Sequence, residues 1–161
     1  MPTAPGAITI KELYWQTAPF GDLSGEQLYS AMRLRQEIFV VEQNCIYSDL
    51  DGLDQSAIHI LAWRGKELMA YLRCLEPGLS YAQSSLGRIV VSPLARGMSL
   101  GRGLVQRGID TNRRIWPNSG IRIAAQAYLE KFYVELGFAV DGAPFDEDGI
   151  SHLHMNYVNV D

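Results

Sequence analysis

The sequence predicts a mixed α/β fold with one central sheet. Apolar runs of strand length recur along the chain, segments with helical periodicity separate some of them, and glycine or proline often marks the boundaries. The chain has 161 residues, of which 47% are hydrophobic, so it is long and apolar enough to bury a core. We therefore expect residues 1–161 to form a single domain.

The first expected elements are a strand and a helix. Residues 7–14 form an apolar run of strand length. Ser24 and Gln27 have the spacing of a capping box, which predicts that a helix begins there. Apolar residues then recur at helical intervals as far as Phe39, and Arg35 is a polar interruption on that face.

A long loop and a group of strands are expected next. Residues 40–55 begin with a short apolar piece and are otherwise polar with a glycine, which is typical of a loop. The apolar runs 58–64 and 67–75 are joined by Gly65-Lys66, a pattern that predicts a β-hairpin. Residues 86–92 form a third run, and the proline that follows favours an end to the strand at this point.

A second helix and the closing elements complete the predicted order. Gly101 and Gly108 lie on an apolar helical face that continues to Ile115, and the two glycines indicate close packing against a sheet. The later elements are expected to be a strand, a short helix that Gly137 caps, and two closing strands: 121–126, 129–136, 138–140 and 153–158.

Composition limits the partners and the compartment. With a net charge of −4 and a pI of about 5.3, the chain lacks the basic character expected of a nucleic-acid-binding protein. No apolar run approaches the ~20 residues of a membrane span, and the N-terminus lacks a signal-peptide pattern. Cys45 and Cys74 are expected to be reduced and structural, and Cys45, in an expected loop, could be a free thiol. We expect a cytoplasmic protein that binds neither nucleic acid nor membranes.

The stretch RGMSLGRGL, residues 96–104, lies between an expected strand and an expected helix. Unpaired N–H groups at the start of a helix favour an anion, and Arg96 adds a guanidinium suited to phosphate oxygens. No Gly-Lys-Ser/Thr follows, and the G-x-G-x-x-G spacing is absent, so neither common nucleotide loop is present. From these residues alone, a phosphate-binding loop and an ordinary surface turn both stay open.

Two stretches together resemble a known family. RGMSLG after GRIVVSP is similar to the acyl-CoA loop of the GCN5-related N-acetyltransferase (GNAT) family, with Arg96 and Gly101 matching and Ser99 standing where a glycine is usual. Residues 126–138 resemble the family's second motif, in which Gln126 and Leu129 replace asparagine and alanine. The matching positions there are Phe132, Tyr133, Gly137 and Phe138. FVVEQNCIYSDLDG and EDGISHLHM resemble the ElaA-like branch of the family.

The resemblance implies a GNAT fold: a mixed, mostly antiparallel sheet, flanked by helices, in which two parallel strands, 86–92 and 121–126, separate to admit acetyl-CoA as acyl donor. The pantetheine arm would pair with the backbone of Ile89 and Val91, like an added strand. The pyrophosphate would lie on the N–H groups of residues 97–102. The residues implied to contact acyl-CoA are Ile89, Val90, Val91, Arg96, Gly97, Met98, Ser99, Leu100, Gly101, Arg102 and Gln126.

The implied reaction is attack of an amine on the thioester carbonyl. Backbone N–H groups near Val91 would stabilise the developing oxyanion, and Tyr133, at the family's general-acid position, would protonate the departing thiolate. Alternatively, Tyr133 only fills a helix face beside its aromatic neighbour. The candidates for the acceptor side are Phe39, Glu42 and His152. Glu42 could be the base or bind a cationic amine, or it could be an ordinary solvated glutamate.

Two features suggest metals, and neither is expected to bind one. His152 and His154 alternate along a strand-like run, and His59 could be a third ligand, but no carboxylate or cysteine cluster accompanies them in the sequence. A structural role or a place on the acceptor wall is the alternative for these histidines. The acidic stretch 49–54 is similar to a calcium loop, but its glycine is misplaced and the distal glutamate is absent. We expect a solvated acidic turn there.

The resulting functional expectation is an acetyl-CoA-dependent N-acyltransferase acting on a primary amine, either a small molecule or a protein lysine. The acetyl group would move by direct attack in a ternary complex. Two alternatives stay open: a catalytically silent acyl-CoA-binding or regulatory module, and a purely structural dimer-forming domain. The oligomeric state does not follow from the sequence, so a homodimer is also open.

Overall fold

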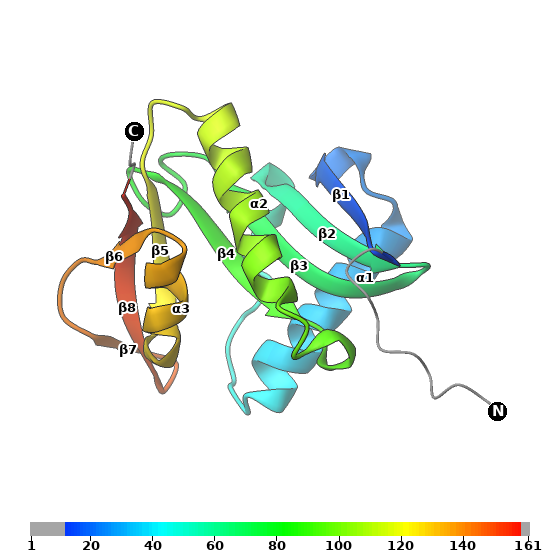
Figure 1. Ribbon diagram of the computed structural model, residues 1–161. Helices are drawn as coiled ribbons and strands as arrows, with labels where there is room; N and C mark the ends of the chain where they lie inside the picture. Colours follow the sequence, from blue (N-terminus) through cyan, green and yellow to red (C-terminus); the bar gives the residue numbers. More distant parts are fainter. Residues whose placement is uncertain (1–11, 159–161) are drawn as a thin grey trace.

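The central element of the computed structural model, which describes residues 12–158, is an eight-stranded sheet (Figure 1). Its order is β1-β2-β3-β4-β5-β8-β6, and β7 pairs with β8. All neighbours are antiparallel except β4 and β5, so the predicted mixed, mostly antiparallel sheet is confirmed. The strands are β1 (Tyr14–Pro19), β2 (Ile58–Arg64), β3 (Glu67–Leu75), β4 (Ser84–Val91), β5 (Ile121–Gln126), β6 (Phe138–Val140), β7 (Phe145–Glu147) and β8 (Ile150–Tyr157).

Helices cover both faces of the sheet (Figure 1). The helices are α1 (Gly25–Arg35), which continues as a π-helical segment (Gln36–Glu42), α2 (Leu100–Ile115) and α3 (Glu130–Glu135). Ile60 on β2 packs in a core with α2, whereas its neighbour Leu61 packs in a second core with α1. Successive side chains of a strand point to opposite faces, so the uninterrupted apolar runs of β2 and β3 follow from burial on both sides.

The capping box is confirmed, but the segments on either side of it differ from prediction. The Ser24 hydroxyl accepts from the Gln27 N–H, and the Gln27 side chain accepts from the Ser24 N–H. The first described strand is β1, not 7–14; residues 7–11 of that prediction lie outside the described residues. The prediction that residues 40–55 form a loop is wrong at its start, because the π-helical segment extends the helix to Glu42.

Close packing between α2 and the sheet is confirmed at Gly108. A Cβ at this position would lie 3.1 Å from side-chain atoms of Leu72 and Leu86, so only glycine lets the helix approach this closely without a shift. The last part of the chain is also close to prediction. α3 is shorter than expected, Gly137 follows it with φ +106, and β7 is a strand that the pattern did not predict.

Both cysteines are buried and free. Burial raises the pKa of the Cys74 thiol, which keeps it protonated. The Cys45 thiol donates a hydrogen bond to the Asp148 carbonyl at 3.4 Å, and the residue is 7% exposed. Cys45 is therefore a free thiol, but it is buried rather than accessible to solvent. Within residues 12–158, none of the helices combines the length and the apolar character that crossing a bilayer requires.

Candidate active site

The gap between β4 and β5 forms the main cleft of the described chain. The two strands pair only where they begin, 84–85 with 121–122, and they separate beyond these residues. Residues 89–91 and 123–126, toward the ends of the two strands, line a cleft of about 800 Å³. The predicted separation of the parallel strands is therefore confirmed. A cleft at the carboxyl ends of parallel strands is where open α/β sheets place their ligands.

A β-bulge in β4 shapes one wall of this cleft. Gly87 and Val90 are in register with β3, but Arg88 and Ile89 between them have no register partner there. Arg88 has φ +51, the left-handed conformation that a bulge imposes. The bulge withdraws backbone groups of β4 from the sheet ladder at the position where the resemblance requires pairing with a ligand. No local sequence signal predicted it.

The loop before α2 lines a second hollow, of about 340 Å³, which shares Val91 and Arg96 with the main cleft. Within the described chain, the N–H groups of residues 97–99 donate no hydrogen bond, and the side chain of Ser99 does not cap the helix. The first N–H groups of α2 also lack intrahelical partners. The loop and the helix start therefore present a row of unused donors, as an anion site requires.

The structure brings ten of the eleven residues expected to contact acyl-CoA to one or other of these hollows. The exception is Met98, whose side chain packs against the hydrophobic core. Arg96 also differs from expectation, because its guanidinium pairs with Glu42 at 2.6 Å. Both side chains are about half exposed, 48% and 46%, and such pairs contribute little, so a phosphate could compete for Arg96.

Ser99 is in the left-handed conformation, with φ +58, at the start of α2. We expect Ser99→Gly to leave acetyl-CoA affinity unchanged or slightly higher, because glycine adopts this conformation without the Cβ penalty. Gly97→Ala is the matched control: at φ +83 it adds a strained Cβ and should weaken binding. Calorimetric titration with acetyl-CoA measures both. A large loss of affinity in Ser99→Gly would instead show that the serine hydroxyl contacts the ligand.

Tyr133 lies on α3, and its side chain lines the main cleft. The residue is only 5% exposed, and its ring makes edge-to-face contacts with Phe132 and Phe138 at centroid distances of 5.0 and 5.8 Å. Burial raises the pKa of Tyr133, so its phenol stays protonated at neutral pH. The ring is therefore packed as the alternative interpretation requires, and the side chain also reaches the cleft as a proton donor would.

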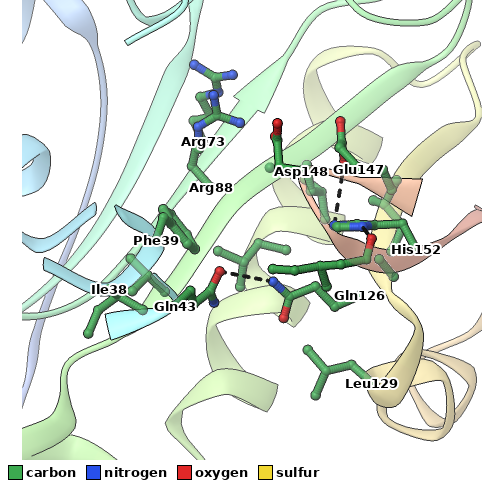
Figure 2. A pocket seen from close by; sticks show the side chains of 18 of the residues that line it. Ile38, Phe39, Gln43, Arg73, Arg88, Gln126, Leu129, Glu147, Asp148 and His152 are labelled. Carbon is green, nitrogen blue, oxygen red and sulfur yellow. Dashed lines mark hydrogen bonds and ion pairs between the residues drawn. The ribbon is translucent and has the colours of Figure 1, made fainter. Parts of the chain in front are cut away.

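The acceptor-side candidates come from both sides of the cleft, with Phe39 on one side and His152 on the other (Figure 2). Phe39 and Glu42, from the π-helical segment, and His152, from β8, all line the cleft. His152 is in register with Gln126, the last residue of β5, and the Gln126 amide donates to Gln43 at 3.3 Å. The cleft therefore brings together residues of the helix, β5 and β8 that are up to about a hundred positions apart in sequence.

His59 is not a partner of the other two histidines. It lies on β2, where one ring nitrogen is 2.6 Å from the Tyr71 hydroxyl and the other is 2.9 Å from the Asp54 carbonyl oxygen. His152 and His154 lie on one face of β8, and Phe145 stacks on both rings. In the part of the chain that the structure describes, no group of three or more His, Cys, Asp or Glu is arranged to hold a metal ion.

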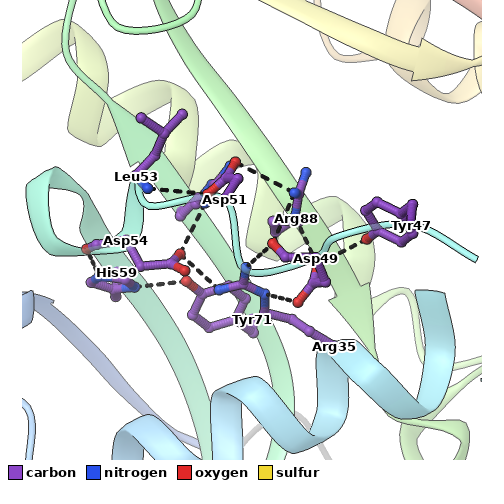
Figure 3. Close-up of polar contacts among 10 residues, drawn as sticks. Arg35, Tyr47, Asp49, Asp51, Leu53, Asp54, His59, Tyr71 and Arg88 are labelled. Atoms are coloured by element: carbon purple, nitrogen blue, oxygen red, sulfur yellow. Dashed lines mark hydrogen bonds and ion pairs between the residues drawn. The ribbon is translucent and has the colours of Figure 1, made fainter. Parts of the chain in front are cut away.

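The prediction of a solvated acidic turn at 49–54 is wrong (Figure 3). Asp49 and Asp54 are buried, and Arg35, which interrupts the apolar face of α1, is 1% exposed and bonds to both at 2.9 and 2.7 Å. Three arginines and three aspartates form a connected cluster: Arg35, Arg73, Arg88, Asp49, Asp51 and Asp54. Opposite charges in equal number compensate the cost of burial.

This ionic cluster supports the wall of the cleft. Arg88, the residue in the bulge, reaches Asp49 at 2.8 Å, and its guanidinium also donates to the Asp49 carbonyl at 2.9 Å. Arg73 on β3 reaches Asp54 at 2.9 Å. These ion pairs connect the loop between the π-helical segment and β2 to α1, β3 and the bulge. Asp51, a member of the cluster, also lines the cleft. A lone arginine on an apolar helix face, followed by closely spaced aspartates, was the available sequence signal.

This architecture, with parallel strands that separate beside an uncapped helix start, defines a CoA-dependent acyltransferase of the GNAT class. A sequence model of the acetyltransferase (GNAT) domain matches residues 22–158. The chain belongs to this family, whose fold binds acyl-CoA and whose members act on amine acceptors. It is therefore an N-acetyltransferase by class.

Individual relatives agree with this assignment. The chain is 42% identical over 145 residues to a UPF0039 protein of Synechocystis, covering 89% of this chain and 94% of the relative. It is 39% identical over 143 residues to the protein ElaA of Escherichia coli, covering 88% and 94%. Among solved structures, an acyl-CoA N-acyltransferase of Pseudomonas aeruginosa superposes with a TM-score of 0.87 at 38% identity, covering 91% of this chain and 99% of the other. The resemblance to the ElaA-like branch is confirmed.

Proposed function

We propose that the protein transfers the acetyl group of acetyl-CoA to a primary amine, by direct attack within a ternary complex. The observation that carries the proposal is that the hollow at the start of α2 and the cleft between β4 and β5 are continuous. The donor-rich start of α2 leads, through Val91 and Arg96, into the cleft between β4 and β5. In this proposal the path would hold the phosphates at one end and the thioester in the cleft at the other, as an extended acyl-CoA needs.

The donor end is assigned to the loop and to β4. Residues 97–102 would receive the pyrophosphate through backbone N–H groups, and Arg96 would exchange its exposed carboxylate partner for a phosphate. The backbone of Ile89 and Val91, which β5 leaves unpaired, would pair with the pantetheine arm. Backbone N–H groups near Val91 would then stabilise the oxyanion of the tetrahedral intermediate.

In the transfer step, the amine nitrogen attacks the carbonyl carbon, a C–N bond forms and the C–S bond breaks. We assign Tyr133 as the acid that protonates the departing thiolate, because its buried phenol stays protonated at neutral pH and its side chain lines the cleft. Phe39, Glu42 and His152 form the acceptor side in this proposal. Glu147 and Asp148 line the cleft without an arginine or lysine partner among the described residues, whereas the arginines that line it are all paired with carboxylates. This excess of negative charge favours a cationic amine, small or on a protein surface.

The proposal also covers the domain organisation of the protein and the compartment in which it acts. We propose that residues 1–161 act as a single domain, and that the protein is cytoplasmic. Both cysteines are free and buried, which suits a reducing compartment.

Calorimetry with acetyl-CoA, followed by a free-thiol release assay across a panel of primary amines, tests this function. The panel should contain monoamines, diamines and lysine peptides, with hydrolysis in the absence of amine as the blank. We expect acetyl-CoA binding and amine-dependent thiol release. Binding without release on any amine would favour the silent acyl-CoA module, and no binding would leave only the structural role.

A further inference from the structure

His152 occupies a position that the donor-side proposal does not use. It lies on β8 in register with Gln126, the residue with which β5 ends, well beyond the point where β4 and β5 are paired. The residue is 8% exposed and lines the cleft together with Gln126 (Figure 2). A histidine at this point borders the space beyond the thioester, where an acceptor amine must approach.

The hydrogen bonds of the ring determine which nitrogen can accept a proton. Nδ1 of His152 lies 2.7 Å from the carbonyl oxygen of Ile150. A carbonyl oxygen only accepts hydrogen bonds, so Nδ1 carries the hydrogen and the neutral ring has its lone pair on Nε2. Phe145 stacks on the ring at a centroid distance of 5.8 Å and an angle of 29°, which holds its orientation.

A carboxylate is placed to stabilise the charged form of this ring. The Nε2 atom of His152 lies 3.5 Å from Oε2 of Glu147, whose side chain is 53% exposed. The distance is longer than a hydrogen bond, so the carboxylate does not occupy the lone pair, yet it is near enough to favour an imidazolium once a proton arrives. Glu147 also lines the cleft and could hold the ammonium form of the substrate close to the ring.

The other titratable groups of the cleft are less suited to remove a proton. Glu42 pairs with Arg96 at 2.6 Å until a phosphate takes that arginine, and its half-exposed carboxylate is then the rival base that Glu42→Gln tests. The hydrogen bond from Arg73 holds the pKa of Asp51 well below its usual range, so that carboxylate is a very weak base. Histidine is the side chain whose ordinary titration lies nearest to neutral pH, where proton transfer in both directions is efficient.

We propose that His152 is the general base that deprotonates the acceptor amine, with Glu147 as its charge partner. This assignment rests on the proposed function. The ammonium gives one N–H proton to Nε2, and the neutral amine attacks the thioester carbon. After the C–S bond breaks, the thiolate takes the Tyr133 proton, and the phenolate recovers a proton from the new amide nitrogen. One proton remains on His152 and leaves to solvent, so the sum is amide, free thiol and one proton.

The groups that surround His152 come from β8 and the segments packed beside it. Glu147 and Asp148 lie at the turn between β7 and β8, and His154 is two residues further along the strand. Tyr81 packs edge-on against His154 and also lines the cleft. The residue opposite on β5 and the stacked phenylalanine are uncharged. Glu147 is the carboxylate nearest to the ring, and His154 is the other titratable group on this face of β8.

His152→Asn tests the assignment, because an asparagine amide can still donate to the Ile150 carbonyl while the Nε2 position is lost. With the amine that the panel identifies, we expect kcat/KM at neutral pH to fall by about 10²-fold, with acetyl-CoA affinity unchanged. The deficit should shrink as the pH rises, because the amine then deprotonates without help. His154→Asn is the matched control: it lies on the same strand, contacts the same phenylalanine and should retain activity and pH profile.

Two results would overturn the assignment. Equal rates for wild type and His152→Asn would show that no base acts from this position. A deficit that stays constant across the pH range would show that His152 only shapes the cleft. Glu42→Gln, measured beside them, should keep the acid limb of the wild-type profile; loss of that limb would move the base to Glu42. Failure of the proposed function is distinct, because the wild-type protein would then release no thiol with any amine.

Discussion

Tyr133→Phe is expected to lower turnover by about 10²-fold or more while acetyl-CoA affinity stays the same. The substitution removes only the hydroxyl, so the edge-to-face contacts with Phe132 and Phe138 persist. Without a proton donor in the cleft, the departing thiolate must leave as an anion. Steady-state kinetics gives turnover, and calorimetry gives affinity for acetyl-CoA.

Tyr157→Phe is the control for this substitution. Tyr157 belongs to the same aromatic group, with its ring 5.6 Å from Phe138, but it does not line the cleft. Its hydroxyl should be dispensable for turnover. If Tyr133→Phe keeps wild-type turnover, the tyrosine is a packing residue and another group protonates the thiolate.

The second large effect is expected for stability. Asp54 accepts from both Arg35 and Arg73, at 2.7 and 2.9 Å, and is 4% exposed. Asp54→Asn keeps the shape and removes the charge, which leaves two buried guanidiniums without a full counter-charge. We expect a loss of about 3–5 kcal/mol in the free energy of unfolding, measured by urea denaturation.

Glu37→Gln is the matched control, because its pair with Arg33 is 2.9 Å long but lies on the surface. Removing this exposed pair should change the free energy of unfolding by less than about 1 kcal/mol. Similar small losses for Asp54→Asn and Glu37→Gln would contradict the view that the buried cluster holds the loop and the bulge in place.

The same cluster predicts how stability responds to acid. Burial alone would raise the pKa of Asp54, but the hydrogen bonds and charges of Arg35 and Arg73 outweigh it and hold the pKa below its ordinary value. A lowered pKa in the folded state adds stability above the unfolded pKa, and this stability is lost as the pH falls through the folded pKa. Asp54→Asn should lack this part of the acid dependence.

Local patterns were sufficient for most of the fold. The bounds of β2, β3 and β5 agree with the predicted 58–64, 67–75 and 121–126, because apolar strand runs and their glycine turns are encoded in neighbouring residues. The capping box likewise depends on residues three apart. The bulge at Arg88 and the extension of the helix to Glu42 were not predictable, since both depend on contacts with distant segments.

Only those parts of the candidate site that lie in recognisable sequence motifs could be predicted. The loop before α2 and Tyr133 follow from stretches that resemble the family's motifs. The ionic cluster could not be predicted from local patterns. Arg35 bonds to aspartates 14 and 19 residues further along the chain, and Arg73 joins them only because β3 lies beside them in the folded sheet. The relation of His152 to Glu147 and to the Ile150 carbonyl likewise depends on the turn between β7 and β8, a strand pair that the pattern missed.

We propose that acyl-CoA enters between β4 and β5 with its phosphates at the start of α2. A crystal structure of the protein with CoA tests it most directly. We expect pyrophosphate oxygens within hydrogen-bond distance of N–H groups in residues 97–102, and the sulfur in the cleft near Tyr133. CoA bound outside this path, or phosphates that make no contact with that loop, would contradict it.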